Sequence, residues 1–203
     1  AIKIISLLGW PALVGLMVLA QPIIMVLFMR GEFTEYHVIQ VSFALFAYLS
    51  GLMSFMFIKV LAPGYYARQD TKSPVKIGIK AMIANMVFNL MLAPFFGYVG
   101  LAIATTLSAS LNAYWLYRGL TATNVYRIAG TTWLFIAKII MAALVMAAVV
   151  YWQSPQFSQW LTMSFTEQIM QLVSCITVGV LCYFFTVAVL GVRFSDFKVQ
   201  TSE

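Results

Sequence analysis

Six apolar segments of membrane-spanning length follow one another along this chain and leave little room for any fold other than a helical membrane bundle. A transmembrane helix needs about 20 consecutive apolar residues, and in hydrocarbon a single segment satisfies its own backbone polar groups only as a helix. Charged residues make up 9% of the chain, against about 25% in soluble domains. The sequence therefore predicts an all-α, polytopic transmembrane bundle of six spans, which cover residues 4–29, 38–62, 75–96, 100–120, 132–152 and 167–190.

The longest polar interruption in the first half of the chain runs from residue 59 to residue 80 and reads KVLAPGYYARQDTKSPVKIGIK. The Pro-Gly pair at 63–64 is expected to end the span before it, because proline lacks an N–H and glycine tolerates the turn. Ser73 is expected to be the N-cap of the next helix, with Pro74 as its first residue. The loop between the two spans is cationic.

Basic residues are distributed very unevenly between the two sides of the predicted bundle. If the spans alternate and the 63–74 loop faces the cytoplasm, the cytoplasmic side holds ten basic residues and the other side holds Arg30 alone. Cytoplasmic loops of membrane proteins carry an excess of Lys and Arg. We therefore expect both ends of this chain to be cytoplasmic. The ten residues are Lys3, Arg68, Lys72, Lys76, Lys80, Arg118, Arg127, Lys138, Arg193 and Lys198.

The charged residues favour a transporter, a channel piece or a structural subunit over an enzyme. The net charge of +6 is scattered at the ends of the spans, which indicates topology and attraction to anionic lipid rather than nucleic-acid binding. All acidic residues lie in loops or at span edges, whereas a proton relay or an acid/base enzyme in a membrane needs an acid within a span. The sequence contains no nucleophile–base pair, phosphate-binding glycine loop or metal-ligand cluster.

Several stretches of the chain resemble one known family. The run KVLAPGYYARQDTKSPVKIGI is similar to the signature of the MurJ/MviN family of lipid II flippases. Three more pieces agree with it, namely LFMRGEF after the first span, the hairpin NLMLAPFFGYVGLAIATTLSASLNA and the ending VAVLGVRFSDF. The resemblance covers essentially the whole chain. The loop run is specific, whereas such hairpins occur across the wider multidrug/oligosaccharide/polysaccharide exporter superfamily.

The resemblance implies that the chain corresponds to helices nine to fourteen of a fourteen-helix flippase in the bacterial inner membrane. Residues 1–120 would be four helices of the second lobe, 121–131 a cytoplasmic connector, 132–190 two additional C-terminal helices, and 191–203 a cytoplasmic tail. The family moves undecaprenyl-pyrophosphate-linked peptidoglycan precursor from the inner to the outer leaflet by alternating access. The implied partners are this precursor, membrane lipid and the N-terminal half of the transporter, with no nucleic acid.

Three other classes of protein stay open at this point. One is another exporter of the same superfamily, such as a polysaccharide-unit flippase or a cation-coupled drug antiporter. A second is a membrane enzyme acting on polyprenyl phosphate, although the intramembrane acids or histidines that it would need are missing. A third is a membrane scaffold half that does not itself transport.

Four basic residues are the candidates for contact with an anionic headgroup. Arg68, Lys72 and Lys76 form a cationic cluster that is expected to attract pyrophosphate at the cytoplasmic mouth, since Lys and Arg are the usual phosphate partners. Lys59 lies one turn from the end of its span, where it either snorkels to the interface or faces an internal cavity. The competing interpretation of the cluster is a topology anchor that meets anionic lipid.

Neutral polar residues form a second candidate site in the hairpin of the third and fourth predicted spans. Asn85 and Asn89 are four residues apart and therefore share a helix face. Counting outward from the turn places Asn89 at the depth of Thr105 and Thr106. Interhelical hydrogen bonding is one interpretation of this seam. The other is a sodium site that couples transport to a monovalent cation, built from Asn85, Asn89, Thr105 and the Leu101 carbonyl, because oxygen ligands suit hard cations.

Overall fold

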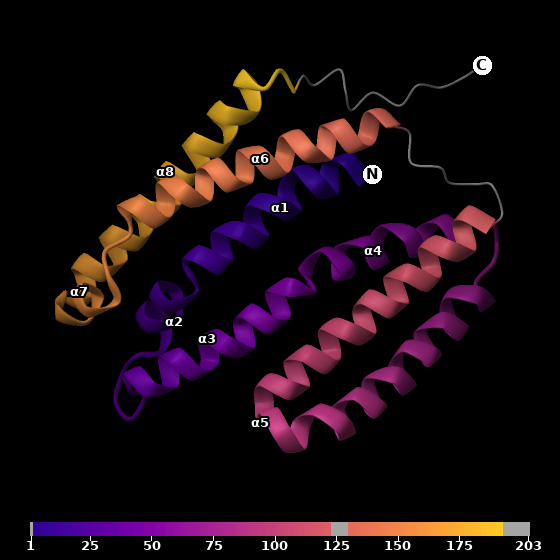
Figure 1. The fold of residues 1–203 in the computed structure, drawn as a ribbon, viewed down its shortest axis with the longest axis horizontal. Helices are drawn as coiled ribbons and strands as arrows, with labels where there is room; N and C mark the ends of the chain where they lie inside the picture. The colour runs from indigo at the N-terminus through magenta and orange to yellow at the C-terminus, as the bar shows by residue number, and fades with distance from the viewer. Residues whose placement is uncertain (1, 123–129, 193–203) are drawn as a thin grey trace. The chain divides into compact units, whose positions relative to one another are not determined.

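The computed structural model describes residues 2–122 and 130–192, and all regular structure in that part of the chain is helical (Figure 1). The helices are α1 (Ile2–Val18), α2 (Ala20–Phe28), α3 (Glu35–Ser50), α4 (Leu52–Tyr66), α5 (Lys72–Ala122), α6 (Gly130–Gln153), α7 (Phe157–Thr162) and α8 (Phe165–Val189). The prediction of an all-α membrane bundle is confirmed. The helices belong to two compact units, one of Ala1–Met29 with Ala129–Glu203 and one of Arg30–Ile128.

The number of membrane crossings does not follow directly from the number of helices. Within the described residues, four helical stretches are long and apolar enough to span a membrane, or five if α1 and α2 together form one bent span. One of the four is α5, which reverses direction at Gly97 and has two arms that coincide with the predicted spans 75–96 and 100–120. The count of six spans and their numbering as helices nine to fourteen stay predictions.

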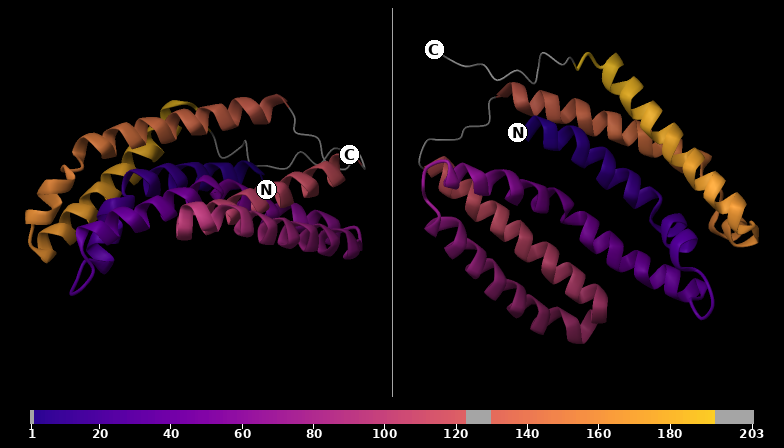
Figure 2. Two further views of the ribbon diagram at one scale, coloured as in Figure 1. Left: turned by 60° about the horizontal axis from the view of Figure 1, so that its bottom comes forward. Right: turned by 180° about the vertical axis from the view of Figure 1, so that it is seen from behind.

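The first unit is built around α6, which packs against both α1 and α8 (Figure 2). Ala142 and Ala143 of α6 are completely buried, and such small residues allow helices in a membrane to approach closely. Ile139 and Cys175 complete the centre of this core. The hydroxyl of Tyr183 on α8 donates a 2.6 Å hydrogen bond to the Leu7 carbonyl, which ties α8 to α1.

The first predicted span is broken rather than continuous. The axes of α1 and α2 meet at 68°, and Leu19 lies at the break. Pro22, in the first turn of α2, explains the position of the break, because its ring would clash with the carbonyl four residues earlier, that of Val18. The helix accordingly ends at Val18.

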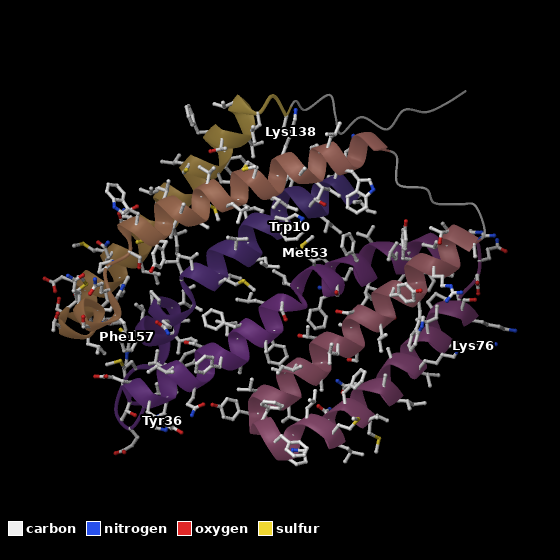
Figure 3. All side chains as sticks on the ribbon, viewed as in Figure 1. Trp10, Tyr36, Met53, Lys76, Lys138 and Phe157 are labelled. Atoms are coloured by element: carbon white, nitrogen blue, oxygen red, sulfur yellow. The ribbon has the colours of Figure 1, made fainter. Side chains whose placement is uncertain are left out.

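Both ends of α8 are capped by hydrogen bonds. At its start, Ser164 and Glu167 form a capping box in which the Glu167 carboxylate accepts the Ser164 N–H at 2.7 Å. At its end, Gly191 adopts a φ of 71°, a conformation that favours glycine. The Lys138 ammonium donates a 2.9 Å hydrogen bond to the Leu190 carbonyl there (Figure 3), where the negative end of the helix dipole attracts a cation.

The second unit consists of α3, α4 and the α5 hairpin, whose two arms lie side by side in Figures 1 and 2. The arms are joined at Gly97, which has φ 57° and ψ −133°. The predicted tight turn at 97–99 is therefore confirmed. Gly100 lies so close to the opposite arm that a Cβ on it would be 2.5 Å from the Leu92 carbonyl oxygen.

The two units do not follow chain order. Residues 1–29 belong with α6, α7 and α8, whereas the predicted segments 1–120 and 132–190 place the first span with α3–α5. The assignment of those segments to flippase lobes stays a prediction. Most of the predicted connector (121–131) and tail (191–203) lies outside the described residues, and so do Arg127, Arg193 and Lys198.

Candidate functional site

Both candidate sites lie in the second unit, and the first is built on the α4–α5 loop. The prediction that 63–64 ends α4 is wrong, because the helix continues to Tyr66. Pro63 costs the helix one N–H bond, to the Lys59 carbonyl, and the residues after it stay helical nonetheless. The helix instead ends in a Schellman motif, in which Gln69 has a φ of 61° and donates to the Tyr66 carbonyl while the Asp70 N–H donates to that of Tyr65.

Asp70 also starts the next helix. Its carboxylate accepts the Ser73 N–H at 3.0 Å, so α5 begins at Lys72 and the prediction of Ser73 as N-cap is wrong. A carboxylate at a helix N-terminus is favoured by both hydrogen bonding and the helix dipole. The hydrogen bonds from Ser73 hold the pKa of the Asp70 carboxyl below its ordinary value. This one residue therefore fixes how α5 leaves the loop.

Beside this loop lies an open pocket of about 380 Å³ lined by three cations, Arg68, Lys76 and Lys80. We call it the basic pocket. Figure 3 labels Lys76 near the start of α5. Its other lining residues are Tyr65, Asp70, Ser73, Ile77 and Gly119.

The basic pocket brings together only part of the predicted cationic set. Lys72 is exposed and does not line it, and neither does Lys59, which is exposed on α4. Lys80, which was not among the four predicted residues, lines the pocket instead. Its spacing of four residues from Lys76 was the available signal, because residues four apart share a helix face.

The wall of the basic pocket is held by Tyr65. Its hydroxyl donates a 2.8 Å hydrogen bond to the Leu116 carbonyl of the second α5 arm. Gly119 leaves room for this, because a Cβ there would overlap the Tyr65 hydroxyl. Tyr65 also packs in a buried cluster with Leu61, Leu116 and Leu120. The pocket therefore rests on packed and hydrogen-bonded structure.

The second candidate site is the polar seam between the two arms of α5. The Asn85 amide donates to Ser108 at 3.2 Å and to Thr105 at 3.5 Å, and the Asn89 amide donates to the Asn85 side-chain oxygen at 3.0 Å. The Thr105 hydroxyl donates to the Leu101 carbonyl at 2.8 Å. All four residues of the predicted seam are thus linked, and Ser108, a polar residue of the same spans that was not among the predicted cation ligands, is a fifth member.

The seam differs from the prediction in its pairing. Asn89 bonds along its own helix to Asn85, and the Thr106 hydroxyl points away from the seam and donates to the Ala47 carbonyl of α3. Among the described residues, the side-chain oxygens of Asn89 and Asn112 are buried without a hydrogen-bond partner. A shallow, open pocket of about 270 Å³ adjoins the seam, and Asn85 and Asn112 contribute to its lining. Neutral oxygens without a hydrogen-bond donor therefore lie in the seam and next to it, and such oxygens suit either a water molecule or a hard cation.

The described residues show no cluster for catalysis by a metal. No group of three or more His, Cys, Asp or Glu residues in that part of the chain could hold a metal ion. The contacts of the two sites support hydrogen bonding at the seam and charge attraction at the basic pocket.

Comparisons with known proteins agree on one family. A sequence profile described as "Lipid II flippase MurJ" matches residues 1–171. A "Probable lipid II flippase MurJ" of Vibrio cholerae is 50% identical over 98% of this chain and 38% of its own length. One from Haemophilus influenzae is 50% identical over 95% of this chain and 38% of its own length.

A solved structure shows the same fold. It is titled "Lipid II flippase MurJ, inward closed conformation". The match covers 93% of this chain and 37% of the chain in that structure, with a TM-score of 0.74 and 23% sequence identity. The chain spans 38% of the length of the two curated relatives. On the profile match and the 50% identity, the chain belongs to the lipid II flippase MurJ family.

Proposed function

We propose that this chain is the C-terminal part of a lipid II flippase, a transporter rather than an enzyme. The whole protein would move undecaprenyl-pyrophosphate-linked peptidoglycan precursor from the inner to the outer leaflet of the bacterial inner membrane by alternating access. The observation that carries the proposal is the 50% identity, over 98% of this chain, to a relative named for that activity. The N-terminal half of the transporter and membrane lipid are the proposed partners.

Within this function, the basic pocket would attract the anionic headgroup at the cytoplasmic mouth. Arg68, Lys76 and Lys80 converge there on one open pocket, and Arg or Lys paired with phosphate forms strong, charge-assisted hydrogen bonds. Lys59 and Lys72 would contribute only long-range attraction, because they lie outside the pocket lining. Anionic membrane lipid is the competing ligand for the same chemistry.

Neutralising the basic pocket should slow flipping. In the full-length transporter, Arg68→Gln with Lys76→Gln should lower the lipid II flipping rate at least tenfold, because charge-assisted hydrogen bonds contribute about 1.5–3 kcal/mol each. The matched control is Lys59→Gln with Lys72→Gln, which removes the same charge outside the pocket. The measurement is flipping in vesicles at equal protein insertion. Equal flipping rates for the two double variants would contradict a role in headgroup attraction and would leave the cations only the role of a topology anchor.

The proposed orientation places the α4–α5 loop in the cytoplasm and the α2–α3 loop outside. After Cys175 and Cys182 are replaced by alanine, single cysteines at Thr71 and Glu32 should react with a membrane-impermeant thiol reagent from opposite sides in intact cells. Both positions are exposed. Only Glu32→Cys is expected to react from outside, and labelling of Thr71→Cys there would contradict the proposed topology.

We also propose that the polar seam forms part of a sodium site, with Asn85, Asn89, Thr105 and the Leu101 carbonyl as oxygen ligands. The buried side-chain oxygen of Asn89, a member of the seam, has no hydrogen-bond partner and supports this proposal. The described residues bring no carboxylate into the seam, so a balancing charge would come from the N-terminal half. Hydrogen bonding between the two α5 arms, at roughly 0.6 kcal/mol per pair, is the competing role.

Sodium should accelerate flipping by the full-length transporter if the seam binds it. Asn89→Leu with Thr105→Val should abolish the sodium dependence, measured as flipping rate across sodium concentrations. Ser110→Ala is the control, because its hydroxyl pairs with Ser54, away from the seam. Sodium dependence that survives in the double variant, or that is absent from the parent, would leave the seam a packing feature.

A further inference from the structure

The α3–α4 segment is interrupted at Gly51 in a way that leaves one carbonyl to be satisfied by side-chain hydroxyls, one from its own helix and one from α5. The Gly51 N–H bonds to the Tyr48 carbonyl three residues back, at 3.0 Å, instead of to Ala47 four residues back. The Ala47 carbonyl accepts hydroxyl groups instead, from Ser50 and from Thr106 of α5, both at 2.7 Å. In hydrocarbon, a helix break persists only where neighbours satisfy the freed groups in this way.

Thr106 fits into the break. A Cβ on Gly51 would be 2.8 Å from the Thr106 hydroxyl oxygen and 2.9 Å from its methyl carbon. Gly51 is buried, and Thr106 is 8% exposed. The absence of a side chain at Gly51 therefore allows Thr106 to reach the Ala47 carbonyl. The break is a built feature, and a helix with such a break can bend there.

On one side of the break, α4 is fastened to the second α5 arm. The Ser54 and Ser110 hydroxyls lie 3.0 Å apart, one turn beyond the break. Near the far end of α4, Tyr65 bonds to the Leu116 carbonyl within its buried cluster. Polar and apolar contacts thus hold α4 at both ends, so α4 and this arm should move as one body.

On the other side of the break, the contact of α3 with the hairpin turn is polar and accessible. The Tyr98 hydroxyl at the turn donates to the Gln40 side-chain oxygen, and the Gln40 amide donates to the Tyr36 hydroxyl at 2.7 Å. Tyr36, labelled in Figure 3, is 66% exposed and Tyr98 is 47% exposed. Such a hydrogen bond exchanges readily with water, because its net stabilisation is small. At the turn itself the two arms lie close together, because Gly97 reverses the chain and Gly100 leaves room for the Leu92 carbonyl.

We propose that α3 swings about Gly51 while α4 stays fixed on α5, and that the Gln40–Tyr98 hydrogen bond is the latch that holds α3 against the hairpin turn. Thr106 is the positioning residue of this hinge. The inference rests on the proposed alternating-access function, because such a transporter must open its pathway first at one side of the membrane and then at the other. It adds which helix moves, where it bends and which contact must break.

Cross-linking the full-length transporter tests the latch. With Cys175 and Cys182 replaced by alanine, cysteines at Gln40 and Tyr98 are joined by a short bifunctional methanethiosulfonate, since the native side chains are longer than two cysteines. Flipping of lipid II in vesicles should fall at least tenfold and recover on reduction. The matched pair, cysteines at Ser54 and Ser110, spans the fixed side and should cross-link with flipping unchanged. Unchanged flipping in the first pair, or equal loss in both, overturns the latch.

Distances between spin labels test the latch independently of whether lipid II is the transported substrate. Labels at Gln40 and Tyr98 should give two distance populations in the vesicle-bound protein, and labels at Ser54 and Ser110 should give one. Thr106→Val should shift the first pair's populations and Thr106→Ser should restore them, because only serine keeps the hydroxyl. A single population for the Gln40–Tyr98 pair overturns the latch. Two populations in a protein that does not flip lipid II support the latch and contradict the proposed function.

Discussion

Gly100→Ala should destabilise the α5 hairpin strongly, although it adds only one methyl group. The new Cβ would lie 2.5 Å from the Leu92 carbonyl oxygen and 2.7 Å from its carbon, and backbone atoms of a helix cannot rotate aside as a flexible side chain can. We expect a loss of at least about 3 kcal/mol, the upper range for overpacking. Thermal unfolding of the full-length protein in detergent, together with its yield, measures the effect.

Gly78→Ala is the matched control for this change. It adds the same methyl group to the same helix, at a position where a Cβ would meet nothing within 4 Å. Alanine is the better helix former by roughly 0.8–1.0 kcal/mol, so this variant should be as stable as the parent or more so. If Gly100→Ala and Gly78→Ala unfold at the same temperature, the two arms do not approach each other this closely.

Trp160→Ala should produce the second large loss, in the first unit. Trp160 is 1% exposed, its indole N–H donates to the Pro155 carbonyl at 3.1 Å, and its carbonyl accepts the Gln168 amide at 2.9 Å. Truncating a buried tryptophan costs about 3–5 kcal/mol. We expect a lower unfolding temperature and faster proteolysis between α6 and α8, because Trp160 anchors α7 in that connection.

Trp152→Ala provides the comparison for Trp160→Ala. Trp152 is at the end of α6 and is 90% exposed, so its removal should leave the unfolding temperature of the detergent-solubilised protein nearly unchanged. In a bilayer it could still anchor the interface, as exposed tryptophans do. Similar destabilisation by both substitutions in detergent would show that burial of Trp160 does not stabilise this connection.

Local patterns were sufficient to predict the helical bundle, the hairpin turn and the membership of the seam. The turn at Gly97 follows from the glycines that interrupt one long apolar stretch. Asn85 and Asn89 share a helix face by spacing, and depth counting brought Thr105 near them. The pairing within the seam was not predictable, because side-chain rotamers decide whether Asn89 bonds across the hairpin or along its own helix.

Features that depend on competition between neighbouring residues escaped the sequence reasoning. Ser73 and Asp70 are both good N-caps, and the carboxylate is the acceptor here because it is placed by the Schellman motif that ends α4. Lys72 and Lys80 have equivalent spacing from Lys76, so spacing alone does not decide which of the two lines the basic pocket, and in the structure it is Lys80. The association of α1 with α6 and α8 depends on packing between segments more than a hundred residues apart, which no local pattern contains.

Because Asp70 ends one helix with its backbone and starts the next with its side chain, the α4–α5 loop has no spare length. A residue inserted before Asp70 would carry its N–H away from the Tyr65 carbonyl, and one inserted after it would carry its carboxylate away from the Ser73 N–H. Either insertion would also change the direction in which Lys76 and Lys80 approach Arg68. The loop should therefore tolerate substitution of its exposed residues far better than any change in its number of residues.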